Sequence, residues 1–282
     1  MIFDSHAHLI SDDIARYPPA PLSGQLRPGD LENPMTAERL LREMDANGVE
    51  RAVLVQRGHV YGFDNSYVCD SAAKYSDRFV AVCSIDAVQP DAADKVRYWI
   101  EERGGVGIRM MEPFKGADTS WFASPAARAV WKAANELDIP VCVHFFRWNR
   151  DIGLPALKSV LDEFPNTTVV IDHFSNMESE AGPPSHGVDA LLMEVAKFPK
   201  AHTKFTTIPL GQLDERKIDA APIVKRVVET FGAPRVMWGS DIAQSRGSYE
   251  YMVKLGRNAT GLLDAADREW VLRGACHAVY GR

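Results

Sequence analysis

The sequence predicts a single α/β domain over residues 1–282, a (β/α)8 TIM-type barrel with a long proline-rich loop after its first strand. Two observations carry this prediction. Short β-rich runs alternate with helical segments along the whole chain, and after the first interval their ends lie roughly 25–35 residues apart, as repeated βα units require. There are eight such runs, which is the number of strands that a closed parallel barrel needs.

The expected strands are short apolar runs bounded by turn residues or by polar residues. In chain order they cover residues 1–6, 51–56, 79–85, 105–110, 140–145, 168–173, 201–205 and 235–239. No linker or low-complexity segment interrupts this series. We therefore expect one barrel domain rather than two small domains.

Helical patterns fill most of the intervals between these runs. Thr36 can N-cap a helix over 37–47, and Gly48 marks its end. Ser124 followed by Pro125 is a cap and first-turn pair at the start of another helix. The remaining expected helices cover residues 91–103, 154–163, 188–198, 222–231, 249–257 and 265–278.

The interval between the first strand and the first helix is unusual because it is long and rich in proline. Proline excludes such a segment from helices and central strands, and loops of this length are usually functional or disordered. We expect the loop to overhang the carboxyl ends of the strands as a lid or pocket wall. The alternative is a surface excursion that packs against a neighbouring subunit. Its prolines are Pro18, Pro19, Pro21, Pro28 and Pro34.

Composition narrows the class of protein. Hydrophobic residues make up 46% and charged residues 25% of the chain, the balance of a globular protein. The net charge of −6 without a basic patch argues against nucleic acid as a partner. No apolar stretch approaches the length of a membrane span, and the start of the chain lacks the basic segment of a signal peptide. We expect a cytoplasmic enzyme with reduced cysteines, and a homo-oligomer is compatible with this sequence.

Candidate catalytic residues stand at the carboxyl ends of the expected strands. The first strand ends in His6-Ala7-His8, and residues i and i+2 of an extended chain point to the same side. The fifth strand ends in His144, the sixth in His173, and the eighth is followed by Asp241. Any one of these histidines alone would suit a hydrogen-bonded core position. Four histidines and an aspartate at the face that holds the active site of such barrels indicate a catalytic centre.

The residue types indicate the chemistry. Imidazole and carboxylate groups suit Zn²⁺ or Mn²⁺, and three histidines with one aspartate give a mononuclear site with room for a water molecule. We expect His6, His8, His144 and Asp241 as ligands of a divalent metal. Asp241 can also take a proton from the water, and His173 is the residue best suited to act as an acid or electrophile beside the metal.

These motifs resemble the amidohydrolase superfamily, specifically the amidohydrolase-related (amidohydrolase-2) family. The resemblance spans the whole chain and implies a (β/α)8 barrel. It is closest to the 2-pyrone-4,6-dicarboxylate lactonase and the sugar lactonases, which implies the opening of a cyclic ester with Asp241 as base. Some lactonases of this group work without a bound metal, so the resemblance leaves the metal dispensable. The matching segments are His6-Ala7-His8, Val55-Gln56, Tyr61-Gly62-Phe63-Asp64-Asn65, Gly105-Val106-Gly107-Ile108-Arg109, His144 on the fifth strand, Ile171-Asp172-His173-Phe174 and Trp238-Gly239-Ser240-Asp241.

Several polar residues near the strand ends are candidates for substrate contact. Arg109, at the end of the fourth strand, is the strongest, since a buried guanidinium needs a partner and a substrate carboxylate fits its fork. The alternative is an internal ion pair, for instance with Glu112 or Asp86. We expect a small anionic substrate with at least one carboxylate. The full set of expected contacts is Arg109, Lys115, Tyr61, Arg147 and Lys204.

Three functions compete on the sequence. The first is a lactonase that acts on a carboxylated or polyhydroxylated lactone. The second is a metal-dependent, non-oxidative decarboxylase of an aromatic or unsaturated acid, a reaction also found in this branch. The third is a barrel retained for binding alone, which the complete set of polar strand ends disfavours. The barrel architecture by itself does not decide between them.

Overall fold

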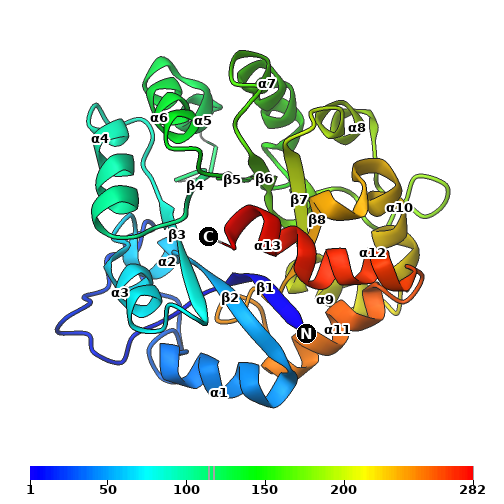
Figure 1. Ribbon diagram of the computed structural model, residues 1–282, viewed down its shortest axis with the longest axis horizontal. Helices are drawn as coiled ribbons and strands as arrows, with labels where there is room; N and C mark the ends of the chain where they lie inside the picture. Colours follow the sequence, from blue (N-terminus) through cyan, green and yellow to red (C-terminus); the bar gives the residue numbers. More distant parts are fainter. Residues whose placement is uncertain (114, 117, 282) are drawn as a thin grey trace.

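The computed structural model describes residues 1–113, 115–116 and 118–281. Eight parallel strands follow one another around a single sheet in the order of the chain, with helices outside them (Figure 1). The predicted (β/α)8 barrel is thus confirmed. The strands are β1 (Ile2–Ala7), β2 (Val49–Val55), β3 (Phe79–Ser84), β4 (Gly107–Met111), β5 (Val141–His144), β6 (Val169–Ile171), β7 (Ala201–Thr206) and β8 (Val236–Gly239).

The ring is closed between β8 and β1 by contacts just beyond the last strand. Ala7 forms a parallel bridge with Ile242, and the Asp241 amide donates to the His6 carbonyl at 2.7 Å. The approach is so close that a Cβ on Gly239 would lie 2.6 Å from the His6 Cβ, which explains why glycine stands there. This closure sets the end of β1 directly beside Asp241.

Most predicted helices are present, and their caps follow the sequence signals. Thr36 accepts a hydrogen bond from the Arg39 amide, and Gly48 ends α1 in the left-handed region with φ 68°. Ser124 caps α6 with Pro125 in its first turn. The helices are α1 (Ala37–Asn47), α2 (Gly58–Tyr61), α3 (Ser66–Lys74), α4 (Ala92–Arg97), α5 (Ser120–Ala123), α6 (Pro125–Glu136), α7 (Arg150–Glu163), α8 (Ala190–Ala196), α9 (Thr207–Glu215), α10 (Ala221–Phe231), α11 (Tyr249–Ala259), α12 (Ala265–Glu269) and α13 (Ala275–Tyr280).

The sequence prediction missed some elements and misplaced several boundaries; for example, α7 begins at Arg150 instead of residue 154. The helices α3 and α9 were not expected, because each is only nine residues long and short periodic patterns are weak signals. Strand β6 ends at Ile171 instead of residue 173. Residues His173–Asn176 follow it with φ of 50–53°, so the chain turns away in a left-handed coil that costs energy for residues with a side chain.

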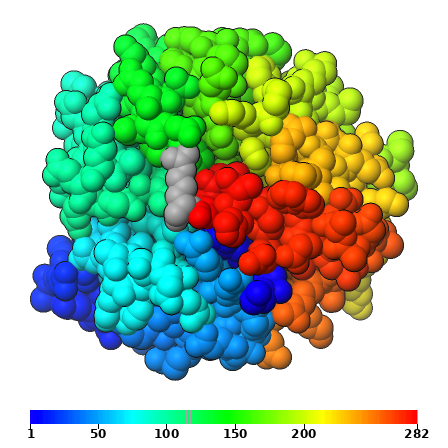
Figure 2. All heavy atoms as spheres, viewed as in Figure 1, coloured from blue at the N-terminus to red at the C-terminus, as the bar shows by residue number. Residues whose placement is uncertain are grey.

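The barrel interior is filled differently at its two ends. Near the amino ends of the strands, α13 lies across the centre of the ring in the view of Figures 1 and 2. Cys276, Val279 and Tyr280 pack there against inward-facing residues such as Phe3 and Val53. The other end holds buried polar groups, among them His6, His173 and Asp241. The sheet therefore has a sealed apolar end and a polar end.

The proline-rich loop between β1 and α1 packs on the polar end. The Ala20 amide donates to the Val60 carbonyl, and the Leu22 amide donates to the Gly58 carbonyl, which ties the loop to α2. The loop thus lies over the carboxyl end of β2, and its role as a lid or pocket wall stays a prediction. Separately, no helix among the described residues is long and apolar enough to cross a membrane.

Candidate active site

A pocket of about 190 Å³ opens at the polar end of the barrel. It is the meeting point of four of the residues predicted from the strand ends. These are His8 after β1, His144 at the end of β5, His173 after β6 and Asp241 after β8. The rest of its wall is formed by Arg57, Gly58, His59, Arg109, Met111, Phe146, Asn176, Ile208 and Gln244.

Three acceptor atoms converge at the base of this pocket. His6 Nε2 and His8 Nε2 lie 3.2 Å apart, and Asp241 Oδ1 lies 3.5 Å from the first and 3.3 Å from the second. Ligands held tetrahedrally at about 2.0–2.2 Å from one ion are separated by about 3.4 Å. The three atoms therefore have the spacing of ligands that share a small cation.

The neighbours of the two histidines indicate which nitrogens carry protons. His8 Nδ1 lies 2.7 Å from the Val55 carbonyl oxygen, which can only accept, so this nitrogen donates. His6 Nδ1 faces Asp172 Oδ1 at 3.4 Å, which favours a proton there as well. In a neutral ring the other nitrogen then carries a lone pair. Two lone pairs and a carboxylate oxygen face one another, an arrangement that needs a cation, either a proton or a metal ion.

In the described part of the chain, one of the two Asp241 carboxylate oxygens accepts a hydrogen bond and the other does not. Its Oδ2 accepts from Ser245 Oγ at 2.7 Å, whereas Oδ1 is buried without a hydrogen-bond partner among the described residues. Burial raises the pKa of Asp241, but the close contact with His8 and the other nearby imidazoles lower the pKa by more, so that it lies below its ordinary value. The residue is ionised, and its free oxygen can accept a proton or hold a cation.

His144 lies apart from this cluster. Its Nδ1 is 3.1 Å from Arg109 Nη2, and because a guanidinium has no acceptor, Nδ1 must accept. Neutral His144 therefore carries its proton on Nε2, which has no hydrogen-bond partner in the described part of the chain. The groups of described residues that could hold a metal include His6, His8 and Asp241 but not His144. The structure brings together three of the four expected ligands and leaves His144 as a donor.

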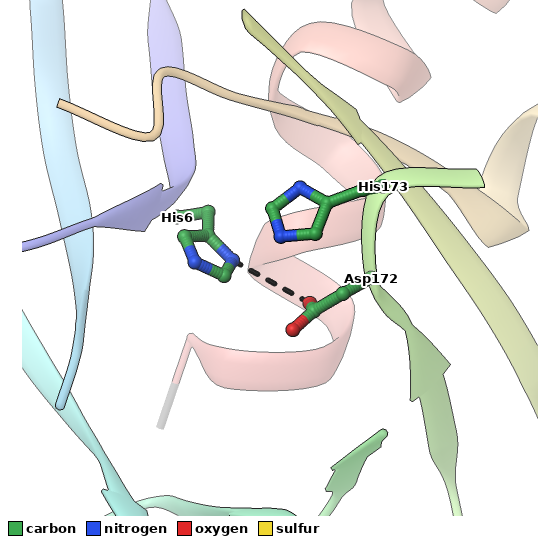
Figure 3. A group of neighbouring side chains, drawn as sticks. All are labelled: His6, Asp172 and His173. Atoms are coloured by element: carbon green, nitrogen blue, oxygen red, sulfur yellow. Dashed lines mark ion pairs between the residues drawn. The ribbon is translucent and has the colours of Figure 1, made fainter. Parts of the chain in front are cut away.

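Asp172, to which the sequence reasoning gave no role, forms an ion pair with His6 (Figure 3) and is the centre of a second cluster. Its Oδ2 accepts from Arg109 Nε at 2.8 Å, and its Oδ1 accepts from Lys204 Nζ at 3.2 Å and from Cys142 Sγ at 2.9 Å. Burial raises the pKa of this carboxyl, yet Lys204 and Arg109 lower it to well below its ordinary value. Asp172 is fully buried and ionised. The sequence feature that could have identified Asp172 is its position directly after the apolar run of β6, where an acidic side chain is unexpected.

His173, the residue after Asp172, also points toward His6, as Figure 3 shows. The centroids of the two imidazole rings lie 5.1 Å apart. Its Nδ1 forms a hydrogen bond of 2.6 Å with Thr206 Oγ1. Burial lowers the pKa of His173 to about 3, so the ring is neutral. The left-handed coil that begins at His173 is held by Arg150 Nε, which donates to Ser175 Oγ at 3.3 Å. Backbone strain of this kind is characteristic of functional sites.

A further buried carboxyl, Asp4, clamps the two strands that carry the acceptor cluster. Its oxygens accept from the amides of His6 at 3.0 Å and Ser240 at 2.8 Å, and from the Tyr249 hydroxyl at 2.9 Å. Asp4 thereby fixes the end of β1 against the segment after β8. The sequence analysis did not identify this positioning residue.

The residues expected to contact substrate lie in different environments. Arg109 lines the pocket but is held in an internal ion pair, with Asp172 as its partner instead of Glu112 or Asp86. Lys204 is fully buried beneath the pocket, where Nζ also donates to the Ser5 carbonyl at 3.2 Å.

The remaining three expected contacts are not among the residues that form the pocket wall in the described chain. The Tyr61 hydroxyl accepts from the Ser11 amide at 2.7 Å under the loop. Lys115 Nζ stands 5.2 Å from the Trp148 ring centroid. Arg147 is exposed and lies 3.4 Å from Glu178. This placement gives no support to a substrate contact by Tyr61, Lys115, Arg147 or Lys204.

Comparison with known proteins adds the family context. The amidohydrolase family model matches residues 3–282. L-fucono-1,5-lactonase from Burkholderia ambifaria is 28% identical over 256 residues, which cover 86% of this chain and 80% of the relative.

Two solved structures share the fold over their whole length. An amidohydrolase from Burkholderia multivorans with bound zinc aligns with a TM-score of 0.75 at 20% identity, covering 100% of this chain and 99% of that one. A probable 2-pyrone-4,6-dicarboxylic acid hydrolase from Acinetobacter baumannii, with citric acid bound, aligns with a TM-score of 0.73 at 17% identity, again covering 100% and 99%.

Proposed function

Because the chain belongs to the amidohydrolase family, and is thus an enzyme that acts as a hydrolase, we propose that it is a lactonase. It opens a cyclic ester, carboxylated or polyhydroxylated, by attack of water at the centre formed by His6, His8 and Asp241. The observation that carries the proposal is the unpartnered Asp241 Oδ1 in the same pocket as the free His144 Nε2. The similarity to L-fucono-1,5-lactonase supports a lactone as the substrate class.

Asp241 is the proton acceptor in this proposal. Its Oδ1 is the carboxylate oxygen left without a hydrogen bond, while Ser245 holds Oδ2 in place. A water molecule that donates to Oδ1 gives up its proton there as its oxygen attacks the lactone carbonyl. The tetrahedral intermediate then collapses with cleavage of the ring C–O bond, and protonated Asp241 returns the proton to the departing alkoxide oxygen. General-base catalysis of this type contributes roughly 10²–10⁴-fold.

His144 is the group that stabilises the developing oxyanion. The Arg109 guanidinium can only donate a hydrogen bond, so His144 Nδ1 accepts from it and the His144 proton stays on Nε2. His144 itself lies on the pocket wall. Its Nε2–H group can donate to the carbonyl oxygen of the lactone. His173 stays neutral at this site and contributes a second imidazole whose ring is fixed by Thr206.

The acceptor cluster also fits a divalent metal. His6 Nε2, His8 Nε2 and Asp241 Oδ1 would hold the ion, and zinc or manganese suits this set of nitrogen and oxygen ligands. A bound divalent ion supplies Lewis acidity, which lowers the pKa of water and polarises a carbonyl. The bound zinc in the Burkholderia multivorans structure supports this assignment.

The test is a screen of lactones with a pH indicator, run on chelator-treated protein with and without added Zn²⁺ or Mn²⁺. We expect acid release from at least one 1,5-lactone by the wild type. The Asp241→Asn variant, prepared in the same way, exposes any contaminating hydrolase. Release of carbon dioxide from an aromatic acid, with no lactone opened, would instead establish the decarboxylase alternative.

A further inference from the structure

A second arginine, Arg57, stands on the pocket wall, and the proposed chemistry does not use it. It follows β2 directly, and its side chain is 1% exposed. Guanidinium groups are rarely buried to this degree unless each N–H has a partner. In Arg57, however, some of the guanidinium nitrogens lack a hydrogen-bond partner among the described residues.

In the described part of the chain, the charged partner of Arg57 is Asp30 of the proline-rich loop. Arg57 Nη2 donates to Asp30 Oδ1 at 2.9 Å, and Asp30 is itself 7% exposed. Arg57 Nε and Nη1 have no hydrogen-bond partner in the part of the chain that the structure describes. Leaving a buried donor unpaired is costly, so these two nitrogens point to a ligand that would complete the set.

The loop holds this pair in position from both sides of the pocket. The Arg27 amide donates to Asp30 Oδ2 at 3.0 Å, and Arg27 Nη2 donates to Gln244 Oε1 at 2.9 Å. Gln244 and Arg57 both belong to the pocket wall. The loop therefore spans the pocket mouth from the β2 side to the β8 side and orients Arg57 through Asp30.

The charges around the pocket favour a neutral ligand on the arginines. Arg57 is paired with Asp30, and Arg109 with Asp172, at 2.9 and 2.8 Å. Burial lowers the pKa of the nearby His59 to about 4, so that ring carries no charge at neutral pH. Arg109 shares Asp172 with Lys204, and Asp241 supplies a further buried carboxylate at the pocket. The three cations Arg57, Arg109 and Lys204 are thus matched by three carboxylates, Asp30, Asp172 and Asp241, which leaves no excess positive charge for a substrate carboxylate. Arg57 keeps N–H groups that can donate to hydroxyl oxygens.

We propose that Arg57, oriented by Asp30 of the proline-rich loop, is a substrate-binding residue that donates hydrogen bonds to hydroxyl oxygens and selects neutral polyhydroxylated lactones. This rests on the proposed lactonase function and chooses one of its two substrate classes. It also replaces the carboxylated substrate that the sequence led us to expect.

The test compares three lactones on the wild type and two variants. D-Glucono-1,5-lactone carries ring hydroxyls, δ-valerolactone carries none, and D-glucaro-1,5-lactone has a carboxylate in place of the exocyclic hydroxymethyl group. Arg57→Gln keeps a hydrogen-bonding group for Asp30 but removes the guanidinium. We expect kcat/KM for D-glucono-1,5-lactone to fall by about 10- to 100-fold, the loss expected for hydrogen bonds from a charged donor. The value for δ-valerolactone should change little.

The second variant, Asp30→Asn, leaves Arg57 in place but removes its counter-charge. We expect kcat/KM for D-glucaro-1,5-lactone to rise relative to that for D-glucono-1,5-lactone. The matched control is Asp45→Asn, which removes the partner of Arg78 from an ion pair of 2.7 Å near the amino end of β2. This control should leave the ratio unchanged.

The outcomes separate the two proposals. If the wild type opens both neutral lactones but Arg57→Gln loses the same factor on each, lactonase activity stands and the role of Arg57 is overturned. An unchanged ratio in Asp30→Asn overturns the charge compensation by the loop. If the wild type opens none of the three lactones, the proposed function fails and the assignment of Arg57 fails with it.

Discussion

Asp172 and Asp241 are both fully buried carboxylates at the carboxyl end of the same barrel, yet their neighbours differ in kind. Asp172 is surrounded by donors, namely Arg109, Lys204 and the thiol of Cys142. Among the described residues the Asp241 carboxylate accepts from one donor, Ser245, and otherwise faces the acceptor nitrogens of His6 and His8. Residue type and burial are the same in the two clusters. What separates a structural carboxylate from a reactive one is whether its partners satisfy it.

The largest effect that this contrast predicts is on stability at Asp172. Replacing it with alanine leaves Arg109 and Lys204 buried without a counter-charge. We expect the free energy of unfolding to fall by about 3–5 kcal/mol, as for other broken buried pairs. Urea unfolding followed by circular dichroism measures this.

Asp70 provides the matched control for that experiment. It also pairs with two arginines, Arg16 and Arg103, but is 31% exposed. Asp70→Ala should lose only about 0–1 kcal/mol per pair, because exposed ion pairs are weak. Equal losses in the two variants would show that the buried cluster has no special role in stability.

The next effect concerns cation binding at the Asp241 cluster. Zn²⁺ added to chelator-treated protein should raise the free energy of unfolding by about 2.7 kcal/mol when free zinc is 100 times its Kd. Differential scanning calorimetry detects this as a rise in Tm. His8→Gln should abolish the rise because it removes one of the three acceptor atoms.

His144→Gln distinguishes the observed cluster from the four-ligand site expected on the sequence. Since His144 Nδ1 accepts from Arg109, this variant should keep the zinc-dependent rise in Tm. Loss of the rise in His144→Gln to the same extent as in His8→Gln would restore His144 as a ligand.

A smaller effect is expected at the one donor that Asp241 has. Ser245→Ala removes the 2.7 Å hydrogen bond to Oδ2, which is worth about 0.5–1.5 kcal/mol. We expect kcat to fall by about 2- to 10-fold. Steady-state kinetics on the lactone found in the screen measure this. Ser66→Ala removes a similar bond to Asp64 away from the pocket, and a comparable fall in that control would argue against a specific role for Ser245.

Much of the barrel and part of its site could be predicted because the signals are local. Strand ends can be read from apolar runs, and in this fold all carboxyl ends meet at one face. That places His8, His144, His173 and Asp241 around one pocket, as the structure shows. The amidohydrolase family was likewise recognisable from these segments, and the family match confirms it.

The roles within the site could not be predicted because they depend on partners far apart in the chain. From the sequence His144 is predicted to be a metal ligand, whereas in the structure its Nδ1 accepts a hydrogen bond from Arg109. From the sequence Arg109 is predicted to be free to bind a substrate carboxylate, whereas in the structure Asp172 lies 2.8 Å from its Nε. Neither contact leaves a pattern in the spacing of the sequence. The proline-rich loop was identifiable, but its link from Asp30 to Arg57 needs the three-dimensional path of the loop.

The most direct test of the account is the turnover of Asp241→Asn on the lactone that the wild type opens. The amide is nearly the same size, accepts from Ser245 and donates to a histidine lone pair, so the variant should fold with unchanged stability. We expect kcat to fall by roughly 10²-fold or more, because the general base is lost. Turnover at the wild-type rate, with unfolding and zinc content also unchanged, would remove Asp241 from the mechanism and contradict the contrast with Asp172.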